Sequence, residues 1–101
     1  MIEYEQTCYA CPEQYDAFYN GERVGYLRLR HGHFRVECPE CFQELVYEAY
    51  PKGDGLFDDE ERDQYLVLAT EAIESWLERK RGIKRPDPKY IVRNKEEYKD
   101  Y

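Results

Sequence analysis

The fold is decided by residues 15–37, which read YDAFYNGERVGYLRLRHGHFRVE. Two dipeptides within this stretch, Asn20-Gly21 and His31-Gly32, favour two-residue hairpin turns, and Asn-Gly is among the strongest short signals for such a turn. The residues on either side of these turns are rich in Val, Tyr, Leu and Phe, which favour strands. The stretch therefore predicts two successive β-hairpins.

The second hairpin can be registered by hand. A turn at His31-Gly32 pairs Arg30 with His33, Leu29 with Phe34, Arg28 with Arg35, and Leu27 with Val36. The apolar members then share one face, which must be the core side because side chains alternate along a strand. The Asn20-Gly21 turn pairs Val24 with Ala17, which places the even-numbered residues of the same strand on the core side instead of the odd-numbered ones. One extra residue near Gly25-Tyr26 reconciles the two patterns, so we expect a β-bulge there.

The segments after residue 41 predict a fourth strand, a helix and a tail. The strand runs from Phe42 to Tyr50 and the helix from Asp58 to Arg81, with Asp58 and Glu61 spaced as in a capping box and Gly82 as the stop. Apolar residues recur at helical spacing and form one stripe that faces the core: Tyr65, Leu66, Ala69, Ala72, Ile73, Trp76 and Leu77. Beyond Gly82, residues 83–101 form an extended or flexible tail, in which Tyr90-Ile91-Val92 can add to a sheet edge in this molecule or another.

All four cysteines lie in two Cys-x-x-Cys pairs, Cys8 with Cys11 and Cys38 with Cys41. Four thiolates in two such pairs suit a tetrahedral Zn²⁺ with a structural role and no open position for water. The alternatives are two redox dithiols or two disulfides. Redox pairs usually open a helix, and neither pair is followed by a helical pattern.

The second pair carries a resemblance. Cys38-Pro39-Glu40-Cys41, with the aromatic Phe42 just after it, resembles the knuckle of the zinc-ribbon class. This resemblance covers roughly the first half of the chain and implies a metal-holding device rather than one particular family. We therefore expect an α+β fold in two parts. Residues 1–82 form a four-stranded antiparallel meander with a four-cysteine zinc site at one end, packed against one helix, and residues 83–101 form the charged tail.

Composition limits the function. The formal charge is −7, with the acidic excess in residues 1–82 and a basic excess in the tail, so the body as a whole repels duplex nucleic acid. No apolar run approaches the length of a membrane span, and the start lacks the pattern of a signal peptide, so we expect a cytoplasmic protein with reduced thiols. The eleven tyrosines are typical of an interaction surface.

The outward face of the second hairpin is the candidate binding site, and it carries Tyr26, Arg28, Arg30, His33 and Arg35. Arg28 directly opposite Arg35 is an unfavourable like-charge pair unless something neutralises it. One interpretation is that Glu44 and Glu48 of the fourth strand supply the neutralising charge. The other is that the face receives a partner's acidic group or a phosphate, which suits the bidentate geometry of arginine.

The leading hypothesis is a non-catalytic, zinc-stabilised protein-interaction module that works through an acidic, tyrosine-rich surface. The same composition fits a viral or mobile-element inhibitor of a host nucleic-acid-binding protein. The alternative is a zinc-ribbon nucleic-acid-binding protein that uses Arg28, Arg30, Arg35 and the basic tail. The sequence shows no phosphate-binding glycine loop, no recognisable triad and no evident small-molecule site, so we expect no enzymatic activity.

Overall fold

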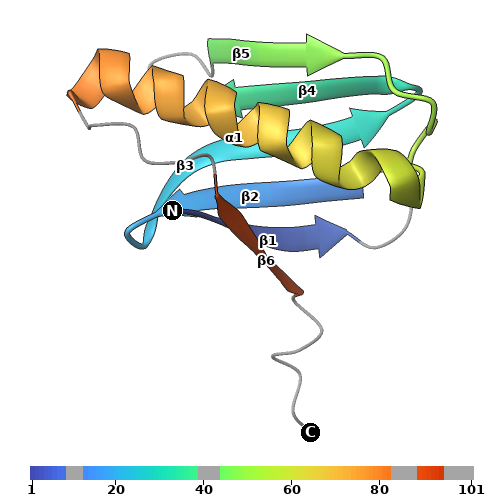
Figure 1. Cartoon of the computed structure of the whole chain (residues 1–101), viewed down its shortest axis with the longest axis horizontal. Helices are drawn as coiled ribbons and strands as arrows, with labels where there is room; N and C mark the ends of the chain where they lie inside the picture. Colours follow the sequence, from blue (N-terminus) through green and yellow to red (C-terminus); the bar gives the residue numbers. More distant parts are fainter. Residues whose placement is uncertain (9–12, 39–43, 83–88, 95–101) are drawn as a thin grey trace, which may run out of the picture.

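The computed structural model describes residues 1–8, 13–38, 44–82 and 89–94. Within these residues the chain is an α+β protein with one mixed sheet and one helix (Figure 1). The elements in chain order are β1 (Ile2–Cys8), β2 (Glu13–Tyr19), β3 (Glu22–Arg30), β4 (His33–Cys38), β5 (Glu44–Ala49), α1 (Asp59–Arg81) and β6 (Tyr90–Asn94). The strand order in the sheet is β5-β4-β3-β2-β1-β6, with β6 parallel to β1 and the other neighbours antiparallel.

The prediction of a four-stranded meander is wrong, because the described sheet has six strands. The first missed strand is β1, in which Ile2 and Tyr4 are buried and alternate with glutamates. The second is β6, where Tyr90-Ile91-Val92 adds to a sheet edge of this same molecule. That outcome was one of the alternatives for the tail. The predicted strand start at Phe42 lies outside the described residues.

Both predicted hairpin turns are confirmed. Positive φ angles of 51° and 83° occur at Asn20 and Gly21, and of 54° and 72° at His31 and Gly32, as such turns require. The predicted pairing of β3 with β4 is confirmed at every position, from Arg30 opposite His33 to Leu27 opposite Val36.

The predicted β-bulge between β2 and β3 exists, but it lies slightly earlier than expected. Ala17 pairs with Gly25 and Phe18 with Arg23, so Val24 is the extra residue. The expected pairing of Val24 with Ala17 is therefore wrong by one position. The bulge still reconciles the two hairpin patterns, because it places the apolar residues of both hairpins on one face of the sheet.

Helix α1 covers that face and completes the core (Figure 1). Its predicted ends are confirmed, with Asp58 at the N-cap and Gly82 in the left-handed region at the C-terminus, where the Gly82 N–H donates to the Glu78 carbonyl at 3.0 Å. Most of the predicted stripe is buried, including Trp76, which is 1% exposed. The core cluster consists of Ile2, Tyr4, Tyr15, Ala17, Val24, Leu27, Leu29, Phe34, Val36, Cys38, Phe57, Leu66, Ala69, Ile73, Trp76 and Leu77.

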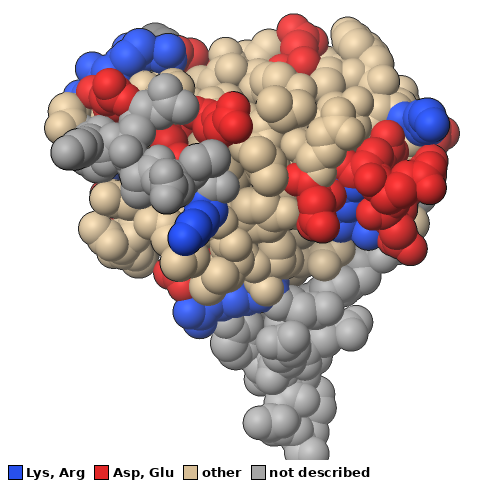
Figure 2. All heavy atoms as spheres, viewed as in Figure 1, with Lys and Arg blue, Asp and Glu red and all other residues tan. Residues whose placement is uncertain are grey.

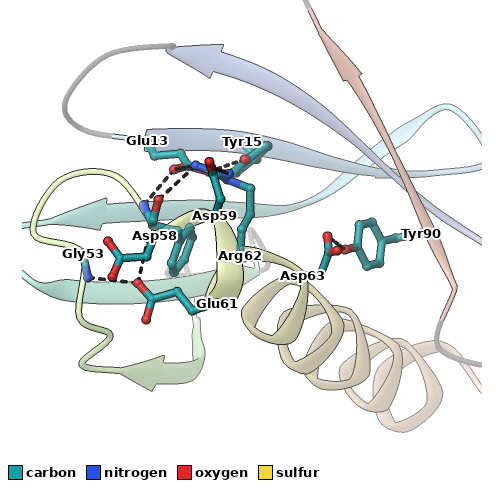
Figure 3. Close-up of polar contacts among 10 residues, drawn as sticks. Glu13, Tyr15, Gly53, Asp58, Asp59, Glu61, Arg62, Asp63 and Tyr90 are labelled. Atoms are coloured by element: carbon teal, nitrogen blue, oxygen red, sulfur yellow. Dashed lines mark hydrogen bonds and ion pairs between the residues drawn. The ribbon is translucent and has the colours of Figure 1, made fainter.

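A buried glutamate fastens the start of α1 to β2. The Glu13 carboxylate is nearly inaccessible and accepts hydrogen bonds from the Arg62 guanidinium at 2.9 and 3.2 Å and from the Phe57 N–H at 3.0 Å. The Tyr15 hydroxyl donates to the same carboxylate (Figure 3). Burial and the neighbouring Glu13 raise the pKa of Tyr15, so the hydroxyl remains a neutral donor. The cluster satisfies its own polar atoms and is structural.

Candidate functional site

The sheet face opposite α1 is not covered by any helix that the structure describes, and we call it the open face (Figure 1). Strand alternation places charged and polar side chains there, because the apolar side chains point toward α1. On β3 and β4 these outward residues include Arg28, Arg30, His33 and Arg35, as predicted. The second predicted hairpin therefore presents its cationic face to solvent.

Four of these side chains and the turn residue His31 surround a hollow of about 170 Å³, which we call the arginine hollow: Arg28, Arg30, His31, His33 and Arg35. Four of the five predicted binding residues line it. The fifth, Tyr26, does not, because its hydroxyl donates to the Gln14 side chain at 2.9 Å and the Arg23 guanidinium lies 5.8 Å from its ring. His31 was missed as a binding residue because its role in the hairpin turn already explained its presence in the sequence. The side chain of a turn residue next to a strand can also reach the face of that strand.

The arginine hollow is only partly neutralised. The Arg35 guanidinium lies 2.9 Å from the Glu37 carboxylate, and the His33 Nε2 lies 2.8 Å from the Glu48 carboxylate. The His33 ring also stacks on Tyr50, with ring centroids 4.9 Å apart. Glu48 is thus on the open face, as predicted for one of the two neutralising glutamates.

Glu44 was expected on the same face, and this expectation is wrong. The register of β4 with β5 shifts between Val36 and Glu37, which leaves Val46 as an extra residue and reverses the parity of the strand beyond it. Glu44 therefore lies on the helix side, 3.7 Å from the Lys80 ammonium. The open face receives one of the two predicted carboxylates.

Two arginines of the hollow have no carboxylate partner among the described residues. Neither Arg28 nor Arg30 has an acidic oxygen within 4.0 Å in this part of the chain, and the Arg28 Nε is buried there without a hydrogen-bond acceptor. Buried polar atoms are nearly always hydrogen-bonded, so this buried nitrogen is an exception among the described residues. The hollow can bind a compact anion.

The predicted zinc ligands are not brought together by the described strands. Cys8 aligns through Gln14 and Arg28 with Arg35 on β4, and Cys38 lies three residues further along that strand. Three strand spacings of about 4.8 Å and three residues of about 3.3 Å separate the two Cα atoms by roughly 17 Å. Two cysteine ligands of one zinc, with Zn–S bonds of about 2.3 Å, have Cα atoms within roughly 10 Å.

Cys8 and Cys38 are the last residues of β1 and β4, and these strands run in opposite directions, so the two cysteines lie at opposite ends of the sheet (Figure 1). Cys38 is buried in the core, whereas Cys11 and Cys41 lie outside the described residues. No group of three or more candidate metal ligands occurs in the part of the chain that the structure describes. The described backbone does not support one zinc ion that holds all four cysteines.

The tyrosine-rich surface is smaller than the composition suggested. Of the described tyrosines, Tyr4 and Tyr15 are buried, and most others pack partly against the core. Tyr50 stands out, with 74% of its surface exposed. Acidic side chains do gather at the end of the molecule where α1 begins (Figure 2), with Asp58, Asp59 and Glu60 all exposed. Tyr50 and Tyr65 line a hollow together with Glu60 and Glu61, so this part of the tyrosine-bearing surface adjoins the acidic end.

No family model, curated protein or solved structure matches this chain. Among the described residues, no helix combines the length and the apolar character that crossing a membrane requires.

Proposed function

We propose that this protein is a non-catalytic protein-interaction module that recognises an anionic feature of a protein partner through its open face. The observation that carries the proposal is the arginine hollow, in which Arg28 and Arg30 lack a carboxylate partner among the described residues. Arginine in such a setting favours bidentate, charge-assisted hydrogen bonds to an external anion. The acidic, tyrosine-rich surface is the weaker candidate for the interface, because Tyr4 and Tyr15 are buried and most of the other described tyrosines pack partly against the core.

Nucleic acid is the second candidate partner for the same face. Three arginines within two adjacent strands favour it. Against it, Glu3, Glu5 and Asp16 lie on the open face of the neighbouring strands β1 and β2, where Arg93 pairs with Glu3 and Arg23 with Asp16. A chain of phosphates would therefore run from the arginines onto a surface of mixed charge that repels it in part. A single anionic group of a protein avoids this repulsion.

The acidic end of α1 supports a further candidate, an inhibitor that occupies the basic site of a nucleic-acid-binding protein. Its supporting observation is the cluster of exposed carboxylates at Asp58, Asp59 and Glu60. Zinc remains a prediction for the two cysteine pairs, and the proposal for the open face does not depend on it.

Two leucines of equal exposure test the proposal. Leu45 faces the open side of β5 beside Glu37, whereas Leu56 lies in the loop before α1, and each is 40% exposed. Affinity capture from native host lysate, with and without nuclease, would use the wild type, Leu45→Glu and Leu56→Glu. We expect a nuclease-resistant partner that Leu45→Glu loses and Leu56→Glu keeps, because a carboxylate on the open face repels an anionic partner.

Three results would change this conclusion. Capture that disappears with nuclease, together with a steep salt dependence on an immobilised polyanion, would support nucleic-acid binding. Capture that Glu60→Lys abolishes and Leu45→Glu keeps would support the acidic end. Equal capture by Leu45→Glu and the wild type would remove the open face as the interface.

A further inference from the structure

We propose that the arginine hollow binds one phosphomonoester dianion carried by a phosphorylated side chain of the partner. This inference rests on the proposed function and names the chemistry of its site. The hollow measures about 170 Å³ and lies on an exposed sheet face. This is several times the roughly 30 Å³ that one water molecule occupies in the liquid, so the hollow has room for a phosphoryl group.

The charges in the hollow favour a dianion over a single carboxylate. Arg28 and Arg30 have no ion pair among the described residues, while Arg35 shares its charge with Glu37 and His33 contacts Glu48. Two guanidinium groups therefore lack a carboxylate partner among the described residues. A phosphomonoester carries close to two negative charges at neutral pH, so one such group can pair with both.

The donors in the hollow fit a phosphoryl group as well as the charge does. The buried Arg28 Nε has no acceptor among the described residues. The opposed Arg28 and Arg35 side chains come from paired positions on β3 and β4, so one ligand between them contacts both strands. Three terminal oxygens can accept from two guanidinium forks at once, as at other arginine sites that recognise phosphorylated side chains.

The rim of the hollow favours a peptide over a nucleic acid. Glu37 and Glu48 flank the cations at 2.9 and 2.8 Å from Arg35 and His33, and Asp54 lies beside the Gly32 turn. These carboxylates tolerate one compact dianion at the centre but repel further phosphates along a backbone. The exposed Tyr50 ring, stacked on His33, offers an apolar contact for a residue next to the phosphorylated one.

Calorimetric titration of the full chain with short peptides tests this inference. The probes are an acetylated pentapeptide with a central phosphoserine, the same peptide with serine, and the same peptide with glutamate. We expect the phosphoserine peptide to bind at least tenfold more tightly than either control. Arg28→Gln combined with Arg30→Gln should weaken its binding at least tenfold, because both unpaired guanidinium groups are removed.

Arg23→Gln is the matched control, because Arg23 also lies on the open face but pairs with Asp16 at 3.1 Å, outside the hollow. It should change phosphopeptide binding less than twofold. If the double variant unfolds, Arg30→Gln alone serves as the test, because Arg30 is exposed and its replacement leaves the fold intact. This single variant should weaken phosphopeptide binding several-fold.

Several outcomes would overturn the inference. These are equal binding of the phosphoserine and serine peptides, equal loss in Arg23→Gln, inorganic phosphate that binds as tightly as the phosphopeptide, or a 5′-phosphorylated oligonucleotide that binds more tightly. If the phosphopeptide fails while Leu45→Glu still loses the lysate partner, the open face remains the interface and only the ligand chemistry is rejected. If lysate capture also survives Leu45→Glu, the proposed function fails as well.

Discussion

Two glutamates hold the start of helix α1, and of their contacts the sequence predicted only the capping box that joins Glu61 to Asp58. Glu13 reaches Arg62 across the core, whereas Glu61 accepts three backbone N–H groups, from Lys52 at 3.0 Å, Gly53 at 2.9 Å and Asp58 at 3.0 Å (Figure 3). The bond from Asp58 confirms the carboxylate half of the predicted capping box. The other two hydrogen bonds tie the loop after β5 to the helix, and no local sequence pattern predicts them.

Glu61→Gln should lower the free energy of unfolding at pH 7 by about 1–2 kcal/mol, the usual range for a lost cap or charged hydrogen bond. Burial alone would raise the pKa of the Glu61 carboxyl, but the three N–H donors outweigh it and hold the pKa below its usual range. A lowered pKa in the folded state means that this stabilisation is present above the unfolded pKa and is lost as pH falls through the folded value.

Urea titrations between pH 3 and pH 7 would measure this effect. The difference between wild type and Glu61→Gln should be largest near pH 7 and shrink toward pH 3. Glu60→Gln, at the exposed neighbouring position, should stay within about 0.5 kcal/mol of the wild type throughout. A difference that grows as the pH falls would contradict the assigned hydrogen bonds.

At the scale of elements, the two β-bulges determine which side chains meet. The bulge at Val24 could be predicted, because the two hairpin turns imposed opposite parities on one strand. The bulge at Val46 could not, since β5 has no second turn to fix its parity, and this is why Glu44 was placed on the wrong face. Turns, the β3–β4 register and the helix ends were predictable because local chemistry sets them.

Gly25, next to the first bulge, lets the helix approach the sheet. A Cβ at this position would lie 3.0 Å from the Ile73 Cδ1 and 3.3 Å from the Ala17 Cβ. Gly25→Ala should therefore destabilise the fold by about 1–3 kcal/mol through overpacking. Ile73→Val removes the nearest atom and alone should cost about 0.5–1.5 kcal/mol.

Denaturant unfolding of the two single variants and of the double variant would separate packing from backbone effects. The double variant should lose less stability than the sum of the singles, because valine vacates the space that the new methyl group needs. Additive losses would show that Gly25 is required for its backbone conformation rather than for the close approach of α1.

At the scale of the whole molecule, an excess of negative charge coexists with a cationic hollow because the charges are unevenly distributed. Carboxylates crowd the end where α1 begins (Figure 2), and the three arginines of the hollow lie on the sheet face opposite α1. Local fields rather than net charge govern what approaches each face within a Debye length of about 8 Å. The formal charge of −7 is therefore compatible with an anion site.

Strand parity also separates the two cysteine pairs. Three antiparallel strands, β2 to β4, follow Cys8 and end at Cys38, and an odd number of strands carries the chain to the opposite end of a sheet. The spacing of the cysteines predicted the number of zinc ligands but contained no information on this separation. The number of strands predicted between the pairs was already odd, so the separation could have been predicted from the strands and was missed because the prediction relied on the cysteine motif.

A double-mutant cycle on Cys8 and Cys38 tests whether one metal ion joins the two ends. If no ion is shared, Cys8→Ala and Cys38→Ala should each change unfolding free energy and zinc content independently. The double variant should then lose about the sum of the single losses, because sites this far apart with no common partner are additive within roughly 0.3–0.5 kcal/mol. Cys38→Ala should be the costlier change, since the Cys38 side chain is buried in the core. Two results together would show instead a shared four-thiolate ion. The double variant would be no less stable than either single variant, and the wild type would hold one zinc per monomer that each single change abolishes. Those results would overturn the placement of β4 relative to β1.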